Sequence, residues 1–277
     1  NSGVIHSGIY YKPGSLKAKN CISGYHQLIE FCDTYSIKYD ICGKIVVATD
    51  EYQLPQLEEL RRRGEANGLQ GIRVLEKEEI REYEPYANGI KALHVLQTGI
   101  IDYTDVIKKY SELVLSSGGE IRCGEKVMKL LTSFDEIAVE TTKNSYIASF
   151  VVSCAGLMSD RVAKMTQEKL PLRIIPFRGE YYKLKKEKEY LVKNLIYPVP
   201  DPAFPFLGVH FTRMVKGGIE AGPNAVLAFK REGYKISDFN WRDSFETFSW
   251  PGFYTIGKKY WRTGLGEFYR SFSKAAF

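Results

Sequence analysis

The chain has 277 residues, of which 44% are hydrophobic and 26% are charged. These proportions are ordinary for a globular protein and exclude a collagen-like chain, a largely disordered chain and a small disulfide scaffold. The net charge of +6 is mild and the basic residues are scattered, which argues against a nucleic-acid-binding protein and allows a peripheral contact with an anionic membrane. No apolar run reaches the ~18 residues of a membrane span.

Cysteine and histidine patterns limit the chemistry further. The five cysteines form no CxxC pair, and their odd number favours free thiols in a reducing compartment. The four histidines form no HxxH or HExxH spacing, so the sequence predicts no metal site. The chain begins without a methionine and ends inside an apparent helix, so we expect a fragment of a longer polypeptide.

The first 118 residues alternate between helical and strand-like patterns. Ser15 can cap a helix over 15–36 with an apolar stripe, and Thr104 can cap a helix that covers 105–116 and closes at Gly118. The other expected elements are strands at 44–48 and 90–96 and helices at 56–66 and 77–82.

The remaining residues predict more strand than helix. Short strands are expected at 120–122, 127–131 and 137–141, and an apolar strand at 146–154. Ser159 is expected to cap a helix that runs to about residue 167. Alternating strands follow at 173–184, 191–197, 206–212 and 218–222, and residues 254–277 read as a helix. Because helix–strand alternation implies a parallel sheet and the later run implies an antiparallel layer, we predict a mixed α/β fold with two intertwined domains.

Two segments have the character of ligand-binding turns. In NSGVIHSG, Gly3 and Gly8 allow backbone N–H groups to approach a ring or a phosphate beside His6; a simple turn with an ordinary histidine is the alternative. Further on, an apolar strand ends in Ala155 and Gly156 before a helix that starts at Ser159 and Asp160. That arrangement suits a nucleotide crevice, and a plain strand-to-helix turn is the alternative.

Two later segments carry polar side chains inside aromatic strands. Arg178 of PFRGEYY could bind a carboxylate with its guanidinium fork, although such an arginine can also form a surface ion pair. His210 of GVHFT, followed by GPNA at 222–225, could serve a substrate site. A core histidine with its hydrogen bonds satisfied is the alternative interpretation.

Taken in order, these segments resemble the L-2-hydroxyglutarate oxidases and dehydrogenases, in the FAD-dependent branch that includes D-amino-acid and glycine oxidases. The resemblance runs over essentially the whole chain, and its most specific strings are PFRGEYY, PVPDPAFPFLGVH and GPNAVLAFKREGY. That family begins with a strand and a GxGxxG loop that holds the FAD pyrophosphate, whereas this chain contains no GxGxxG. The chain therefore resembles the family without its N-terminal region and its C-terminal segment.

The resemblance implies an FAD-binding, Rossmann-like domain, incomplete at its start, from residues 1–40 and 101–175. It implies an antiparallel-sheet substrate domain from residues 41–100 and 176–277. The implied activity is oxidation of L-2-hydroxyglutarate to 2-oxoglutarate by hydride transfer to FAD. The alternatives are a related FAD oxidoreductase that acts on glycerol 3-phosphate or an amino acid, and an inactive truncated product.

The resemblance also assigns roles to residues. His6 and His210 are the candidate catalytic bases, and the choice between them stays open. Substrate contacts are expected from Arg178, Tyr181 and Asn224. FAD contacts are expected from Ser2, Gly3, Val4, His6, Gly8, Val127, Ala155, Gly156, Ser159 and Asp160. The implied partners are a small dicarboxylate and an electron acceptor, either oxygen or a quinone. The expected location is the cytoplasm or the inner-membrane periphery of a bacterium, or the mitochondrion of a eukaryote.

Overall fold

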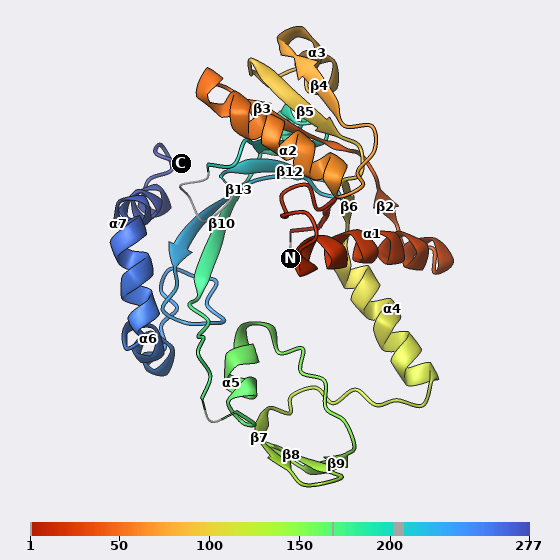
Figure 1. Ribbon diagram of the computed structural model, residues 1–277, viewed down its shortest axis with the longest axis vertical. Coiled ribbons are helices and arrows are strands. Elements are labelled where there is room, and N and C mark those ends of the chain that lie inside the picture. The colour runs from red at the N-terminus through yellow and green to blue at the C-terminus, as the bar shows by residue number, and fades with distance from the viewer. Residues whose placement is uncertain (1, 168, 202–207) are drawn as a thin grey trace. The chain divides into compact units, whose positions relative to one another are not determined.

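The computed structural model describes residues 2–167, 169–201 and 208–277 (Figure 1). The chain divides into two compact units, each considered by itself below. Unit 1 comprises residues 1–117 and 180–224, and unit 2 comprises residues 118–179 and 225–277. The two units are defined by contacts within the chain, whereas the expected domains are defined by binding of FAD and of substrate. The division into an FAD domain and a substrate domain therefore stays a prediction.

A seven-stranded mixed sheet dominates unit 1 and has the order β10-β13-β12-β11-β3-β5-β4. β11 pairs with β3 in parallel, and β12, β13, β5 and β4 extend the sheet with antiparallel pairs. The strands are β3 (Lys44–Ala48), β4 (Arg73–Glu76), β5 (Lys91–Val95), β10 (Phe177–Lys183), β11 (Leu195–Pro198), β12 (His210–Arg213) and β13 (Ile219–Leu227). The sequence prediction of a strand at 44–48 is confirmed, and the expected alternating run after residue 173 does contain strands β10 to β13.

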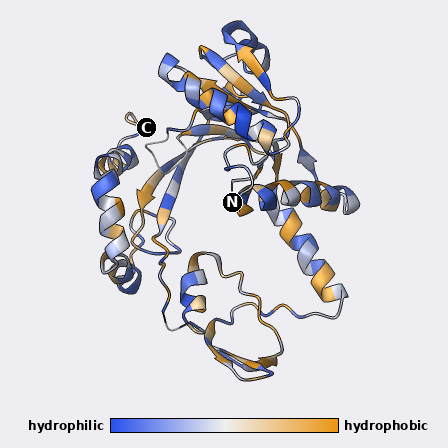
Figure 2. Cartoon of the chain, in the orientation of Figure 1, coloured by the Kyte–Doolittle hydropathy of each residue, from blue (hydrophilic) through white to orange (hydrophobic). Residues whose placement is uncertain are grey.

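Both faces of β3 are buried, because successive side chains point to opposite faces of a strand. On one face, Val46 and Ala48 join a core cluster with Leu57 and Leu60 of helix α2 (Leu54–Ala66). On the other face, Ile45 and Val47 pack with Ile80 of helix α3 (Lys77–Tyr83). The visible side of α2 in Figure 2 is mostly hydrophilic, as expected for a helix that covers one face of a sheet.

A smaller sheet and two longer helices complete unit 1. The sheet has the order β1-β6-β2, with β1 (Val4–Ile5), β2 (Tyr39–Asp40) and β6 (Gly99–Ile101). Its core cluster joins Ile5 and Ile101 to Cys32 of α1 (Leu16–Thr34) and Val106 of α4 (Tyr103–Ser116). Short 3-10 turns lie at η1 (Glu51–Gln53) and η3 (Lys186–Leu191).

The two N-caps expected in unit 1 have different outcomes. Ser15 caps α1, since its hydroxyl accepts a hydrogen bond from the N–H of Ala18. Thr104 does not cap α4; the carboxylate of Asp102 does, and it accepts the N–H of Thr104 at 2.8 Å. The helix therefore begins earlier than predicted, because an aspartate two residues upstream is also a good capping residue.

Unit 2 contains a three-stranded antiparallel meander, β7 (Val127–Thr132), β8 (Ile137–Thr141) and β9 (Ser145–Ala148). It also contains the turn η2 (Gly156–Met158) and the helices α5 (Ser159–Ala163), α6 (Trp241–Phe248) and α7 (Pro251–Phe272). The expected strands at 127–131 and 137–141 and the C-terminal helix are confirmed. The expected strand at 120–122 is wrong, since those residues form no strand.

The expected apolar strand at 146–154 is only partly correct. It ends at Ala148, and residues 149–155 have no strand assignment, with Phe150 and Val152 exposed at 90% and 86%. A strand needs a neighbour for its backbone hydrogen bonds, whatever its hydrophobicity. Residues 206 and 207 of the expected strand at 206–212 lie outside the described residues, and β12 begins at His210.

Two glycines of unit 1 give opposite stability predictions. A Cβ at Gly99 would lie 2.7 Å from the backbone oxygen of Asp40, so Gly99→Ala forces adjacent strands apart. We expect a loss of about 1–3 kcal/mol. Gly24 lies inside α1 with nothing within 4 Å of its added Cβ, so Gly24→Ala is the matched control and gains about 1 kcal/mol from helix propensity. Urea unfolding of the two variants measures both values, and equal effects would contradict this account.

Candidate active site

Aromatic and basic side chains form a row across one face of the seven-stranded sheet. Tyr197 on β11 stacks on His210 of the neighbouring β12, with ring centroids 4.2 Å apart and an interplanar angle of 13°. His210 lies opposite Gly222 of β13, and an added Cβ at Gly222 would meet the ring of Tyr181 at 2.6 Å. The missing side chain at Gly222 thus makes room for Tyr181 beside His210.

Lys44 continues this row on the other side of Tyr197. Its Nζ lies 4.8 Å from the ring centroid of Tyr197 and 4.3 Å from that of Tyr10. The side chain is only 2% exposed, and it makes no hydrogen bond or ion pair within the described part of the chain. Burial without an anionic partner lowers the pKa of Lys44 to about 7. Two ring faces are its main stabilising contacts.

His6 follows β1, in the loop that leads to α1. Its backbone carbonyl accepts a hydrogen bond from the thiol of Cys21 at 3.4 Å. Loss of surrounding solvent, with the charges of Lys44 and His210, lowers the pKa of His6 to about 4. The residue nevertheless keeps more than a third of its surface exposed, so a ligand can reach it.

The hydrogen bond made by His210 fixes which of its ring nitrogens can accept a proton. Nδ1 lies 3.0 Å from the carbonyl oxygen of Gly208, and a carbonyl can only accept, so Nδ1 carries the hydrogen. Nε2 of the neutral ring then bears the lone pair. Burial lowers the pKa of His210, and the charge of Lys44 acts in the same direction. The ring is therefore a proton acceptor at neutral pH.

The other expected site residues of unit 1 have mainly structural contacts. Val4 is buried and pairs with Ile100, Ser2 is half-buried, and Gly8 accepts hydrogen bonds from Tyr11 and Asn67 through its carbonyl. Gly3 and Gly8 have φ angles of 65° and 84°, which glycine adopts easily. Asn224 is buried and donates to Glu180 at 3.0 Å. Their expected ligand contacts remain predictions.

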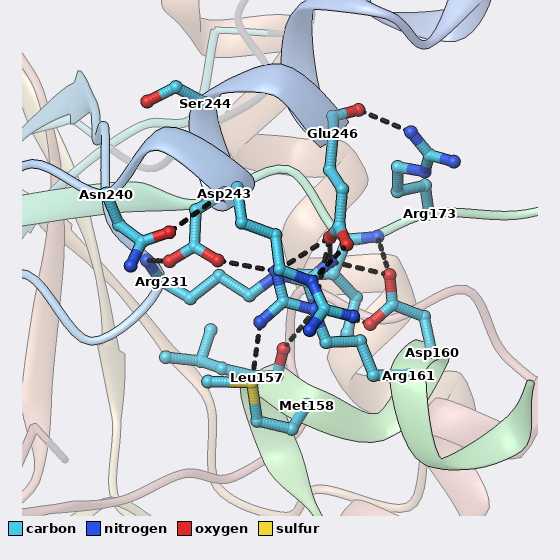
Figure 3. Close-up of polar contacts among 12 residues, drawn as sticks. Leu157, Met158, Asp160, Arg161, Arg173, Arg231, Asn240, Asp243, Ser244 and Glu246 are labelled. Atoms are coloured by element: carbon cyan, nitrogen blue, oxygen red, sulfur yellow. Dashed lines mark hydrogen bonds and ion pairs between the residues drawn. The ribbon is translucent and has the colours of Figure 1, made fainter. Parts of the chain in front are cut away.

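In unit 2, Asp160 belongs to a buried network of ion pairs (Figure 3). Its carboxylate pairs with the guanidinium of Arg231, and both side chains are 2% exposed. Burial would raise the pKa of Asp160, but the hydrogen bonds from Arg231 and from the N–H of Ile174 lower it to about 2. The network continues through Arg161, Asp243 and Glu246. It holds residues 157–161 against the segment that carries α6.

The remaining residues expected around FAD lie in the same unit. Val127 is half-buried and pairs with Thr141, Ala155 precedes η2, and Gly156 is exposed with a φ of 52°. Ser159 is the first residue of α5 and does not cap it; Met158 precedes it without a side-chain cap. The helix ends at Ala163, four residues before the expected end. The FAD contacts assigned to these residues stay predictions.

Arg178 also belongs to unit 2, where it is 8% exposed. Its Nη1 donates to the backbone carbonyl of Lys235 at 2.9 Å. This contact fixes one edge of the guanidinium. The expected substrate contact is not tested by it.

Sequence reasoning missed three members of the row and its surroundings: Lys44, Tyr10 and Tyr197. Lys44 opens the strand KIVVA, and every other residue of that strand is apolar. A lysine that begins a buried strand is unusual, and this was the available signal. Nothing in the local sequence singled out either tyrosine, because Tyr197 meets Lys44 through the pairing of β11 with β3 and Tyr10 meets it from the loop after β1.

A second feature of the sheet is a cavity of about 410 Å³ beside Val47, Ile196 and Phe211. Its described lining is mainly apolar and contains no lysine, arginine or histidine. A dicarboxylate would lack a cationic partner there. The row that contains His210 and Lys44 is the better candidate active site. The described residues contain no cluster of three potential metal ligands.

Comparison with known proteins identifies the class to which this fold and site belong. The model of the FAD dependent oxidoreductase family matches residues 1–260, and the chain belongs to that family. Within it, the chain is 59% identical to the L-2-hydroxyglutarate dehydrogenase of Indibacter alkaliphilus, over all of this chain and 70% of that protein. The recognition of this family from sequence is confirmed.

Two further proteins extend the comparison. A mitochondrial L-2-hydroxyglutarate dehydrogenase of Mus musculus is 44% identical over 98% of this chain and 61% of its own length. Among solved structures, the L-alpha-glycerophosphate oxidase of Mycoplasma pneumoniae with FAD bound has a TM-score of 0.74 and 26% identity. That match covers 84% of this chain and 62% of the oxidase. The present chain thus spans about two thirds of the proteins it matches.

The residues of unit 1 fit the FAD that the family uses. The hydroxyls of Ser7 and Tyr10 are buried and find no hydrogen-bond partner among the described residues. Buried polar groups are normally satisfied, so these two indicate a bound polar group in the complete site. The buried charge of Lys44 suits a ring that becomes electron-rich on reduction. The N-terminal loop is the segment that sequence analysis expected to contact FAD.

Proposed function

We propose that the protein to which this chain belongs oxidises L-2-hydroxyglutarate to 2-oxoglutarate. The reaction breaks the substrate's Cα–H and O–H bonds, and the product gains a carbonyl. FAD supplies the hydride acceptor when it is bound. The proton on the hydroxyl must leave to a base, and the supporting observation is the neutral, tautomer-fixed ring of His210 on the candidate active-site face.

The residues of unit 1 divide the remaining work in this proposal. Nε2 of His210 accepts the hydroxyl proton, while the carbonyl of Gly208 stabilises the imidazolium that forms. His6 lies in the N-terminal loop and contacts FAD. Tyr181, next to His210 across Gly222, orients the substrate through its phenol. The assignment of Arg178, which lies in unit 2, to a carboxylate of the substrate stays a prediction from the family resemblance.

A direct experiment tests the activity. The full-length, FAD-loaded protein is mixed with L-2-hydroxyglutarate without oxygen, and flavin absorbance near 450 nm is followed. We expect bleaching by the L isomer and none by the D isomer. Glycerol 3-phosphate and amino acids serve as comparison substrates, since the relative of known structure named above is a glycerophosphate oxidase. Bleaching by one of these alone would replace the proposed substrate.

The electron acceptor and the compartment belong to the same proposal. Oxygen and a quinone are both compatible with the reaction, and oxygen uptake measured against quinone reduction separates them. No helix of the described residues has the length and hydrophobicity to cross a bilayer. The mitochondrial name of the mouse relative supports a mitochondrial location for a eukaryotic protein. For a bacterial protein, the proposed location is the cytoplasm or the periphery of the inner membrane.

A further inference from the structure

Lys44 is a buried, positively charged side chain to which the sequence assigned no role. Among the residues the structure describes, no carboxylate pairs with Lys44, His6 or His210. A buried charge without a counterion costs several kcal/mol of desolvation, so it demands a functional reason. Its neighbours are the rings of Tyr10 and Tyr197 and the thiol of Cys21, which is close enough to affect its titration.

The distance between Lys44 and His210 follows from the stack between them. Nζ lies 4.8 Å from the Tyr197 centroid, and the His210 centroid lies 4.2 Å from the same point. The ammonium is therefore no more than about 9 Å from the imidazole, the sum of those two distances. Tyr197 stands on β11, the strand between those of Lys44 and His210, and its ring screens a charge less than water does.

We propose that Lys44 is a positioning residue for proton transfer: its buried ammonium, held against Tyr197, keeps His210 in the neutral form that can accept the substrate's proton. This inference rests on the proposed function. A second positive charge on His210 would face Lys44 across one ring, with no acid to offset it. The same ammonium opposes protonation of His6, the other imidazole near this face.

The titration of Lys44 itself agrees with this role. Lys44 is charged below about pH 7, the range in which an ordinary histidine takes up a proton. Among the residues that the structure describes, the titratable groups near His210 are Lys44 from β3, Tyr197 from β11, Tyr181 from β10 and His6 from the N-terminal loop. Burial raises the pKa of both tyrosines, to about 12 for Tyr197. They stay neutral in this range, and Lys44 and the imidazoles set the local charge.

The test compares Lys44→Met with Lys108→Met in the full-length, FAD-loaded protein. Lys108 is an exposed lysine of α4. Its replacement removes the same charge from the protein, but solvent screens that charge from a buried site much more than it screens Lys44. For Lys44→Met we expect the acid limb of kcat/KM to move up by about one pH unit. For Lys108→Met and for the charge-retaining Lys44→Arg, the limb stays within about 0.2 units.

A spectroscopic readout separates this inference from the proposed function. The His210 ring signal, assigned with His210→Gln, is titrated by NMR in the wild type and in Lys44→Met or, if that variant does not fold, Lys44→Gln. A rise in its pKa upon loss of the lysine supports the inference even if L-2-hydroxyglutarate is not oxidised. An unchanged His210 titration in a folded, flavin-containing variant overturns it, even if the wild type is active.

Discussion

Replacing His210 with glutamine should lower kcat/KM for L-2-hydroxyglutarate by about 10²- to 10⁴-fold, the usual contribution of a positioned general base. Glutamine cannot accept a proton at neutral pH, although it retains polarity and similar length. The neutral ring that donates Nδ1–H to Gly208 has only Nε2 available as a base. Stopped-flow measurement of flavin reduction in the full-length protein isolates this step from electron transfer to the acceptor.

Two further histidine variants make this result interpretable. His94 lies on β5 against Tyr83, in register with Ile45, so its side chain points to the face opposite Lys44. His94→Gln should leave flavin reduction within about threefold of the wild type. His6→Gln tests the other candidate base. Unchanged reduction in His210→Gln together with a large loss in His6→Gln would assign the proton transfer to His6.

Unit 2 provides the second large effect, on stability rather than rate. Asp160→Asn should reduce the free energy of unfolding by about 3–5 kcal/mol, because it leaves the guanidinium of Arg231 buried without its main counterion. Arg231 and Asp160 are each 2% exposed, and Nη2 of Arg231 lies 2.8 Å from the carboxylate. Urea unfolding followed by circular dichroism measures the change.

An exposed ion pair of the same network is the control. Arg242 is 71% exposed and pairs with Glu246 at 3.1 Å, so Arg242→Ala should cost less than about 1 kcal/mol. Equal losses in the two variants would show that burial does not matter here. The pKa of Asp160 is lowered in the fold, so its contribution is complete above the ordinary carboxyl pKa. It is lost as pH falls toward about 2.

Local patterns in the sequence predicted most elements of unit 1, because the caps and hydrophobic patterns that define those elements lie within the elements themselves. Ser15 caps a helix with an apolar stripe, and KIVVA forms a strand with two buried faces. Segments that depend on distant neighbours were predicted less well. The stretch from Phe150 to Val152 has strand-forming residues and no strand partner, and the information that decides this is not in the stretch itself.

The candidate site divides in the same way. His6 and His210 were predicted because histidines in glycine-rich or aromatic settings are few and chemically suggestive. Lys44 and Tyr197 were missed because their importance comes from a contact between β3 and β11. Asp160 shows a further limit of prediction from sequence. Small residues and an aspartate at the start of a helix are equally compatible with ligand binding and with an ion pair. Its pairing with Arg231 depends on a residue 71 positions away.

The parallel pairing of β3 with β11 also has a consequence for the timing of synthesis. It places Ile45 beside Ile196, and a ribosome that adds about 5–20 residues per second needs roughly 8–30 s to travel between those two codons. Throughout that interval the apolar strand β3 lacks one of its two neighbours. Among the strand pairs that the structure describes, this one waits longest for its later member, and the proton-transfer groups meet only after β12 has been made.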